Sequence, residues 1–84
     1  MFTIDEFTAK TGITLYELHK EHLSFESVCI ARKCYPLMDE KRFLDILIDG
    51  FRYAPSTCAE WIKMCMVAHD LIEEANRFVP LLTE

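Results

Sequence analysis

The sequence has little glycine and proline, and it lacks the alternation of apolar and polar residues that is typical of half-buried β-strands. Only two glycines and three prolines interrupt its 84 residues, so helix caps must supply most of the boundaries between elements. The longest unbroken apolar runs, such as residues 64–68, are too short to cross a bilayer. We therefore expect an all-α protein that is not inserted into a membrane.

A basic, apolar start typical of a signal peptide is also missing. Lys and Arg total 9 against 14 for Asp and Glu, so the formal net charge is −5. This balance disfavours non-specific binding to nucleic acid or anionic lipid, because such binding depends on cations that displace counterions. We interpret the four cysteines, which lie among apolar residues, as free thiols in a reducing compartment, and we expect a cytoplasmic protein without a cofactor.

Hydrophobic residues make up 51% of the chain, which argues against disorder and predicts a single domain over residues 1–84. Each helix is expected to begin after a capping residue. The five proposed capping residues are Thr3, Thr14, Ser24, Asp39 and Thr57. The corresponding helices are predicted over residues 4–11, 15–23, 25–35, 39–53 and 58–78, and the last is ended by Pro80.

The fourth and fifth of these helices are rich in apolar residues. In the fourth helix the apolar residues lie on nearly all sides, which predicts central burial or an oligomer interface: Phe43, Leu44, Ile46, Leu47, Ile48 and Phe51. In the fifth they recur at three- and four-residue steps: Trp61, Met64, Cys65, Ala68, Leu71, Ile72, Ala75, Phe78 and Val79. We interpret this stripe as core, with a dimer seam as the alternative. A compact bundle of four to five helices is therefore expected.

Within residues 4–23, a short helix, a Thr-Gly-Ile turn and a second capped helix follow one another. This segment resembles the helix-turn-helix of MerR-type and excisionase-type DNA-binding proteins at Phe7, Gly12, Ile13, Thr14 and Leu18. The resemblance implies DNA contacts from Tyr16, His19 and Lys20. The chain departs from the family at Thr8, where the family has alanine, in the acidic Glu17 and Glu21, and in the missing basic wing. DNA-binding transcriptional regulation is therefore the alternative function.

The leading hypothesis is a small acidic protein that regulates or inhibits another protein by binding it. Its size and character are similar to those of bacteriophage accessory regulators, including host-enzyme inhibitors and lysis regulators. Because arginine and aromatic residues are favoured at interfaces, the candidate partner-binding residues are Arg32, Tyr35, Arg42, Phe51 and Arg52. A homodimer is also expected, since so small a domain should not bury all of Phe43, Ile46, Ile48, Phe51, Trp61, Val67 and Phe78.

Few side-chain pairs suggest metal binding or catalysis. Two pairs have the helical spacing of metal ligands, His19 with His22 and Cys65 with His69, but neither has the further ligands of a structural zinc site. Cys65 with His69 is also the one nucleophile and base pair, and Asp45 with Asp49 is the clearest carboxylate pair. A cysteine mechanism needs a lowered thiol pKa and a cleft, which a chain this short seldom builds. We therefore expect neither a metal site nor enzyme activity.

Overall fold

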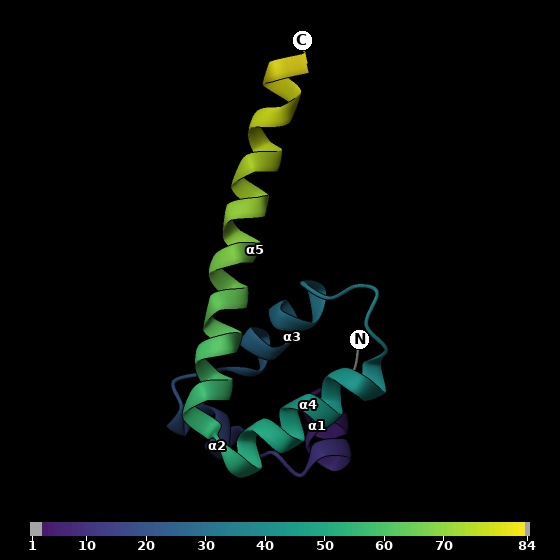
Figure 1. The fold of residues 1–84 in the computed structure, drawn as a ribbon, viewed down its shortest axis with the longest axis vertical. Helices are drawn as coiled ribbons and strands as arrows, with labels where there is room; N and C mark the ends of the chain where they lie inside the picture. Colours follow the sequence, from purple (N-terminus) through teal and green to yellow (C-terminus); the bar gives the residue numbers. More distant parts are fainter. Residues whose placement is uncertain (1–2, 84) are drawn as a thin grey trace.

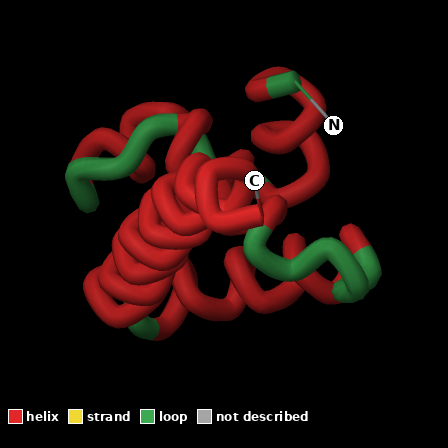
Figure 2. The backbone as a smooth tube through the Cα atoms, turned by 90° about the horizontal axis from the view of Figure 1, so that it is seen from above, coloured by secondary structure: helices red, strands yellow, loops and turns green. Residues whose placement is uncertain are grey.

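The computed structural model describes residues 3–83, and it describes the side chains of residues 3–77. Five helices follow one another along this part of the chain, which contains no strand: α1 (Ile4–Thr11), α2 (Leu15–Lys20), α3 (Phe25–Lys33), α4 (Glu40–Tyr53) and α5 (Pro55–Thr83). Figure 2 shows these helices in red, joined by short green connections. The predicted all-α bundle with a long C-terminal helix is therefore confirmed.

The first half of α5 is the element on which the bundle is assembled. Both α3 and α4 pack against α5, and α1 packs against α4. The second half of α5 extends away from this body (Figure 1), so the molecule measures 49 Å along its longest axis but only 22 and 18 Å along the others. The radius of gyration is accordingly 14.5 Å, above the ~12 Å of a compact domain of this length.

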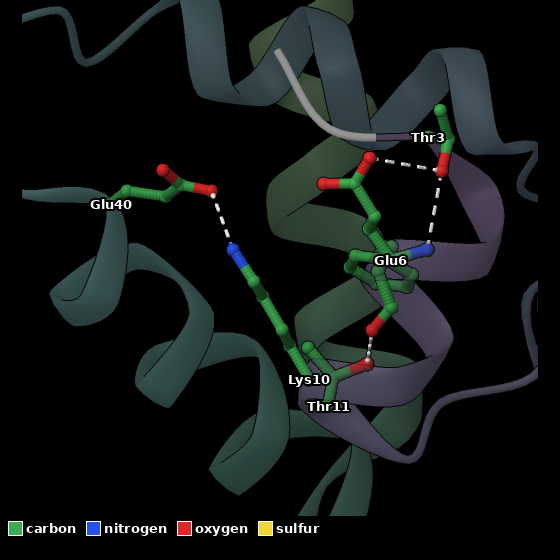
Figure 3. A network of polar contacts seen from close by, with 6 residues as sticks. Thr3, Glu6, Lys10, Thr11 and Glu40 are labelled. Atoms are coloured by element: carbon green, nitrogen blue, oxygen red, sulfur yellow. Dashed lines mark hydrogen bonds and ion pairs between the residues drawn. The ribbon is translucent and has the colours of Figure 1, made fainter.

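Helix α1 begins and ends where the sequence predicts. The Thr3 hydroxyl accepts a hydrogen bond from the Glu6 amide at 3.2 Å, as expected of an N-cap. At the other end, Gly12 has a φ of 75°, a left-handed conformation that favours glycine. Figure 3 shows the Thr3 cap at the start of α1, together with an ion pair of 3.8 Å between Lys10 of α1 and Glu40 of α4. This ion pair links the two helices at the surface.

Helix α2 ends at Lys20, earlier than predicted, because the chain turns at His22. That residue has a φ of 61°, and the amides of His22 and Leu23 donate to the carbonyls of His19 and Leu18 at 3.0 and 2.8 Å. These two bonds form a Schellman motif, in which His22 takes the position that glycine usually occupies. Since Leu18 and Leu23 are both buried, their burial offsets the cost of the left-handed histidine.

Both ends of α5 differ from the prediction. The helix begins at Pro55, because proline suits a first turn, where its fixed φ matches the helix and its missing amide needs no partner. Ala54 before it is non-helical, with a φ of −151°, as a residue before proline usually is. Thr57 therefore lies inside the helix and does not cap it. At the far end α5 continues to Thr83, past Pro80, since a proline removes one helical hydrogen bond and can kink a helix without ending it.

The core lies where the shorter helices meet the first half of α5. Its largest fully buried side chains are Phe7, Leu18, Val28, Phe43, Leu47 and Ile62. Helix α4 buries Phe43, Leu44 and Leu47. Its other apolar residues Ile46, Ile48 and Phe51 are only half-buried, so the predicted central burial holds for one side of the helix, and the alternative of an oligomer interface stays a prediction. The opposite side of α4 carries charged residues that face solvent.

The predicted core stripe of α5 is core only in its first part. α5 buries Cys58, Ala59, Ile62 and Cys65 and half-buries Trp61, whereas the remaining described stripe residues are exposed: Met64, Ala68, Leu71, Ile72 and Ala75. Phe78 and Val79 lie outside the described side chains. The reason is length: a helix of 29 residues spans about 43 Å, and α4 with 14 residues spans about 21 Å. The shorter helices cannot cover all of α5.

We expect Leu47→Ala to lower the free energy of unfolding by about 2 to 5 kcal/mol, because it removes a fully buried side chain and leaves a cavity. Tyr53→Ala is the matched control on the same helix, since Tyr53 is 77% exposed, and it should change stability by less than about 0.5 kcal/mol. Urea unfolding followed by circular dichroism measures both. Equal losses for the two variants would contradict the assigned core.

Candidate protein-binding face

The main exposed apolar feature lies on the half of α5 that leaves the bundle. Four large side chains are more than half exposed there: Met64 at 71%, Val67 at 60%, Leu71 at 61% and Ile72 at 57%. Together with the exposed Ala68 and Ala75, we call these residues the outer face of α5. Contiguous apolar patches on monomers are usually small and often functional, and a lone helix has little stability in water. Both arguments favour an interaction role for the outer face.

A groove of about 370 Å³ joins the outer face to the body of the protein. It lies between the C-terminal end of α3 and the middle of α5, and its lining is largely apolar: Cys34, Tyr35, Trp61, Met64, Cys65, Ala68 and Ile72. Three of these residues, Met64, Ala68 and Ile72, also belong to the outer face. The groove and the outer face are therefore one continuous surface.

The floor of this groove is held by hydrogen bonds across it. The Trp61 indole Nε1–H donates to the Tyr35 hydroxyl at 2.9 Å, and the centroids of these two rings are 5.7 Å apart. The Cys34 thiol donates to the Cys65 carbonyl at 3.3 Å. Because these contacts tie residues on both sides, the groove is preformed rather than dependent on rearrangement.

The candidate partner-binding residue Arg32 has an internal role. Its guanidinium donates to the Tyr35 carbonyl at 2.6 Å and lies 5.8 Å from the centroid of the Phe43 ring. Arg32 and Tyr35 are both half-buried. Tyr35 lines the groove, and Arg32 stabilises the segment between α3 and α4 through the Tyr35 carbonyl. Tyr35 therefore lies at a candidate surface, and Arg32 contacts the segment that carries it; partner binding by either residue stays a prediction.

The remaining partner-binding candidates lie elsewhere. Phe51 and Arg52 line a second groove of about 260 Å³, beside the turn at Gly12. Arg42 is exposed on α4, ten residues before Arg52 and therefore about 15 Å away along the helix axis. The five candidates thus do not form one surface. Met64, Leu71 and Ile72, which do share a surface, belong to the stripe that the sequence predicts as core, with a dimer seam as the alternative.

The candidate DNA-binding residues lie on the surface of α2. Tyr16, His19 and Lys20 are all exposed, on a helix of six residues that also carries Glu17. Thr14 caps this helix as predicted, by accepting a hydrogen bond from the Glu17 amide at 3.2 Å. The turn geometry is therefore compatible with a helix-turn-helix, while the short, partly acidic helix is poorly suited to phosphate contacts. DNA recognition stays a prediction.

In the candidate catalytic pairs, Cys65, His69 and Asp45 contact other side chains and not their pair partners. The Cys65 thiol contacts the Tyr35 hydroxyl at 3.9 Å, whereas His69 pairs with Glu73 at 3.7 Å. Asp45 pairs with Lys41 at 3.3 Å. Among the described residues, no cluster of three or more His, Cys, Asp or Glu side chains is placed to hold a metal ion. His19 lies in α2, whereas His22 lies beyond its end in a left-handed conformation, so the two residues do not have the helical spacing that the sequence suggested.

All four cysteines are free thiols, and burial makes three of them harder to ionise. Desolvation raises the pKa of Cys58 to about 11. Desolvation is also the main cause of the raised pKa values of Cys29 and Cys65. The charge of Lys33 partly lowers the pKa of Cys29, and the hydrogen bond to Tyr35 partly lowers that of Cys65. Since the thiolate is the reactive form, these thiols are weak nucleophiles at neutral pH.

The fold and the site define an all-α protein with an exposed, groove-bearing apolar helix. Within the described residues, no helix combines the length and the hydropathy needed to cross a membrane. Comparison with protein-family models, with curated proteins and with solved structures finds no match to this chain.

Replacing Tyr35 by Phe should lower the free energy of unfolding by about 1 kcal/mol, because the half-buried Trp61 indole loses its hydrogen-bond acceptor. Trp61 is the single tryptophan of the chain, so its fluorescence emission reports directly on this site and should shift. Tyr53→Phe, which alters an exposed hydroxyl, is the control and should change neither quantity. Unaltered emission in Tyr35→Phe would argue against the hydrogen bond.

The raised pKa of Cys58 predicts a loss of stability at alkaline pH. In the folded protein the Cys58 thiol keeps its proton up to about pH 11, whereas the same thiol in the unfolded chain ionises near pH 9.0. The contribution of Cys58 is therefore fully present below pH 9 and declines as the pH rises from about 9 to 11. Melting temperatures of the wild type and of Cys58→Ala should diverge over this window, with the wild type falling more steeply. Parallel curves would show that the thiol is not desolvated.

Proposed function

We propose that this protein acts by binding another protein, as a small acidic regulator or inhibitor, through the outer face of α5 and the adjoining groove. The exposure of Met64, Val67, Leu71 and Ile72 is the observation that carries this proposal. Full burial of such a side chain stabilises a complex by about 1.5 to 3 kcal/mol. Because each of the four is more than half exposed, a partner that covers them gains a substantial part of this free energy.

The groove supplies an anchoring position for the partner. Trp61 and Tyr35 form part of the preformed floor of the groove, and tryptophan and tyrosine are enriched among the residues that dominate binding energies. An apolar side chain inserted between these two side chains and Met64 would displace water from a largely apolar lining. The expected partner therefore presents an apolar helix or loop with at least one large side chain.

Charged residues of both signs lie beside the outer face. Glu60, Lys63, Asp70, Glu74 and Arg77 are exposed along one side of it, so a partner with opposite charges at matching positions would associate faster than one with like charges there. We propose a role in the cytoplasm, which is supported by the four free thiols. We also propose that this role is non-catalytic, because Cys65 and His69 each contact a different residue and not one another. The similarity to bacteriophage accessory regulators rests on size and charge.

Affinity capture with the full chain tests the proposed function. Leu71→Asp places a charge on the outer face, whereas Asn76→Asp places the same charge on another side of α5, about 7.5 Å further along the helix. We expect specific protein partners in nuclease-treated cytoplasmic extract with the wild type and with Asn76→Asp, and we expect at least about tenfold weaker capture with Leu71→Asp. Equal capture by all three chains would show that the outer face is not the binding surface.

DNA binding through α2 is separated from this proposal by fluorescence anisotropy on DNA duplexes at low salt. A salt-sensitive signal that Lys20→Glu abolishes would support the helix-turn-helix alternative, because phosphate contacts depend on cations. Leu71→Asp should leave such a signal unchanged, since Leu71 is exposed on α5 and lies outside α1 and α2.

A further inference from the structure

The outer face of α5 contains a regular repeat. Met64, Ala68, Leu71 and Ala75 follow one another at steps of four, three and four residues, and Trp61 precedes Met64 by three. This is the spacing of the a and d positions of a coiled coil. The residues of α5 that pack into the body, Cys58, Ala59, Ile62 and Cys65, lie mainly on a different side of the helix. The repeat is therefore an additional seam that the bundle leaves uncovered.

Large and small residues alternate along this seam. Met64 and Leu71 occupy one kind of position, and Ala68 and Ala75 occupy the other. In a parallel pair each residue would meet its own copy, so alanine would face alanine and leave gaps between the larger layers. In an antiparallel pair centred between residues 69 and 70, Met64 lies opposite Ala75 of a second copy, and Leu71 lies opposite its Ala68. Each large side chain then meets a small one, which suits close packing.

Most of the charges that flank the seam agree with the antiparallel arrangement. Glu60, Lys63, Asp70, Glu74 and Arg77 lie towards one edge of the seam and are exposed. In an antiparallel pair that edge faces its own copy, and Lys63 comes close in height to Glu74 of the second copy, while Glu60 comes close to its Arg77. Asp70 comes close to its own copy, so this one position opposes the pairing, and four opposite-charge contacts outweigh it. In a parallel pair the charged edge would face the opposite edge, where the described residues Ile62, Cys65, His69, Ile72 and Asn76 include no Lys, Arg, Asp or Glu.

We propose that the outer face of α5 binds a second copy of this chain in antiparallel orientation. This inference rests on the proposed function, because it identifies one protein that covers the same face. The alternation of side-chain size and the placement of opposite charges both make the seam complementary to itself. The acidic residues Glu60, Asp70 and Glu74 beside the seam also oppose binding to anionic lipid or nucleic acid.

Sedimentation equilibrium of the full chain under reducing conditions, over a wide concentration range, tests the pairing. The wild type and Asn76→Asp should form a reversible dimer of twice the chain mass. Leu71→Asp should raise the dissociation constant by about a hundredfold, because pairing would bury an ionised carboxylate in the seam. Circular dichroism verifies that each variant keeps its helices. A monomeric wild type, or a dimer that persists in Leu71→Asp, would overturn the proposal.

A charge exchange tests the orientation. Lys63→Glu and Glu74→Lys should each weaken the dimer, because each places like charges opposite one another, and the double variant should regain most of the lost affinity. The two positions are too far apart on one helix to interact directly, so recovery requires the second copy. Absence of recovery would overturn the antiparallel arrangement. The proposed function is judged separately: capture of another protein that depends on Leu71 would support it even for a monomeric chain.

Discussion

The close approach of α4 and α5 at Gly50 and Cys58 is the contact on which the remaining arrangement depends. A Cβ added to Gly50 would lie only 2.6 Å from the Cys58 sulfur, so the two helices meet at a distance that no larger residue permits. Only Ala54 separates the two helices along the chain. The direction of α5 is therefore set within a few residues of this contact, and Leu47 and Ile62 are buried in the core that it closes.

This direction explains why α5 is covered over only part of its length. The shorter helices pack around its first half, and none of them is long enough to follow it further (Figure 1). An amphipathic helix usually hides its apolar stripe within its own domain, but here Leu71 and Ile72 remain exposed. The consequence is an apolar surface that no other helix of the described chain covers.

The aromatic cluster around Trp61 connects this surface to the core. Phe43 is fully buried, and its ring lies 6.0 Å from that of Trp61, which in turn donates a hydrogen bond to Tyr35. Arg32 completes the arrangement through the Tyr35 carbonyl. Side chains that would otherwise adapt to a partner are thus held in place beforehand, which lowers the entropic cost of binding.

The sequence alone determined which segments are helical and where most of them begin, because a cap such as Thr3, Thr14 or Ser24 satisfies backbone groups within its own turn and needs no distant residue. Only the tertiary structure decided that His22 turns the chain left-handed and that Leu71 faces solvent. A periodic stripe shows which side of a helix is apolar, but whether another helix covers that side depends on packing between segments far apart in the sequence.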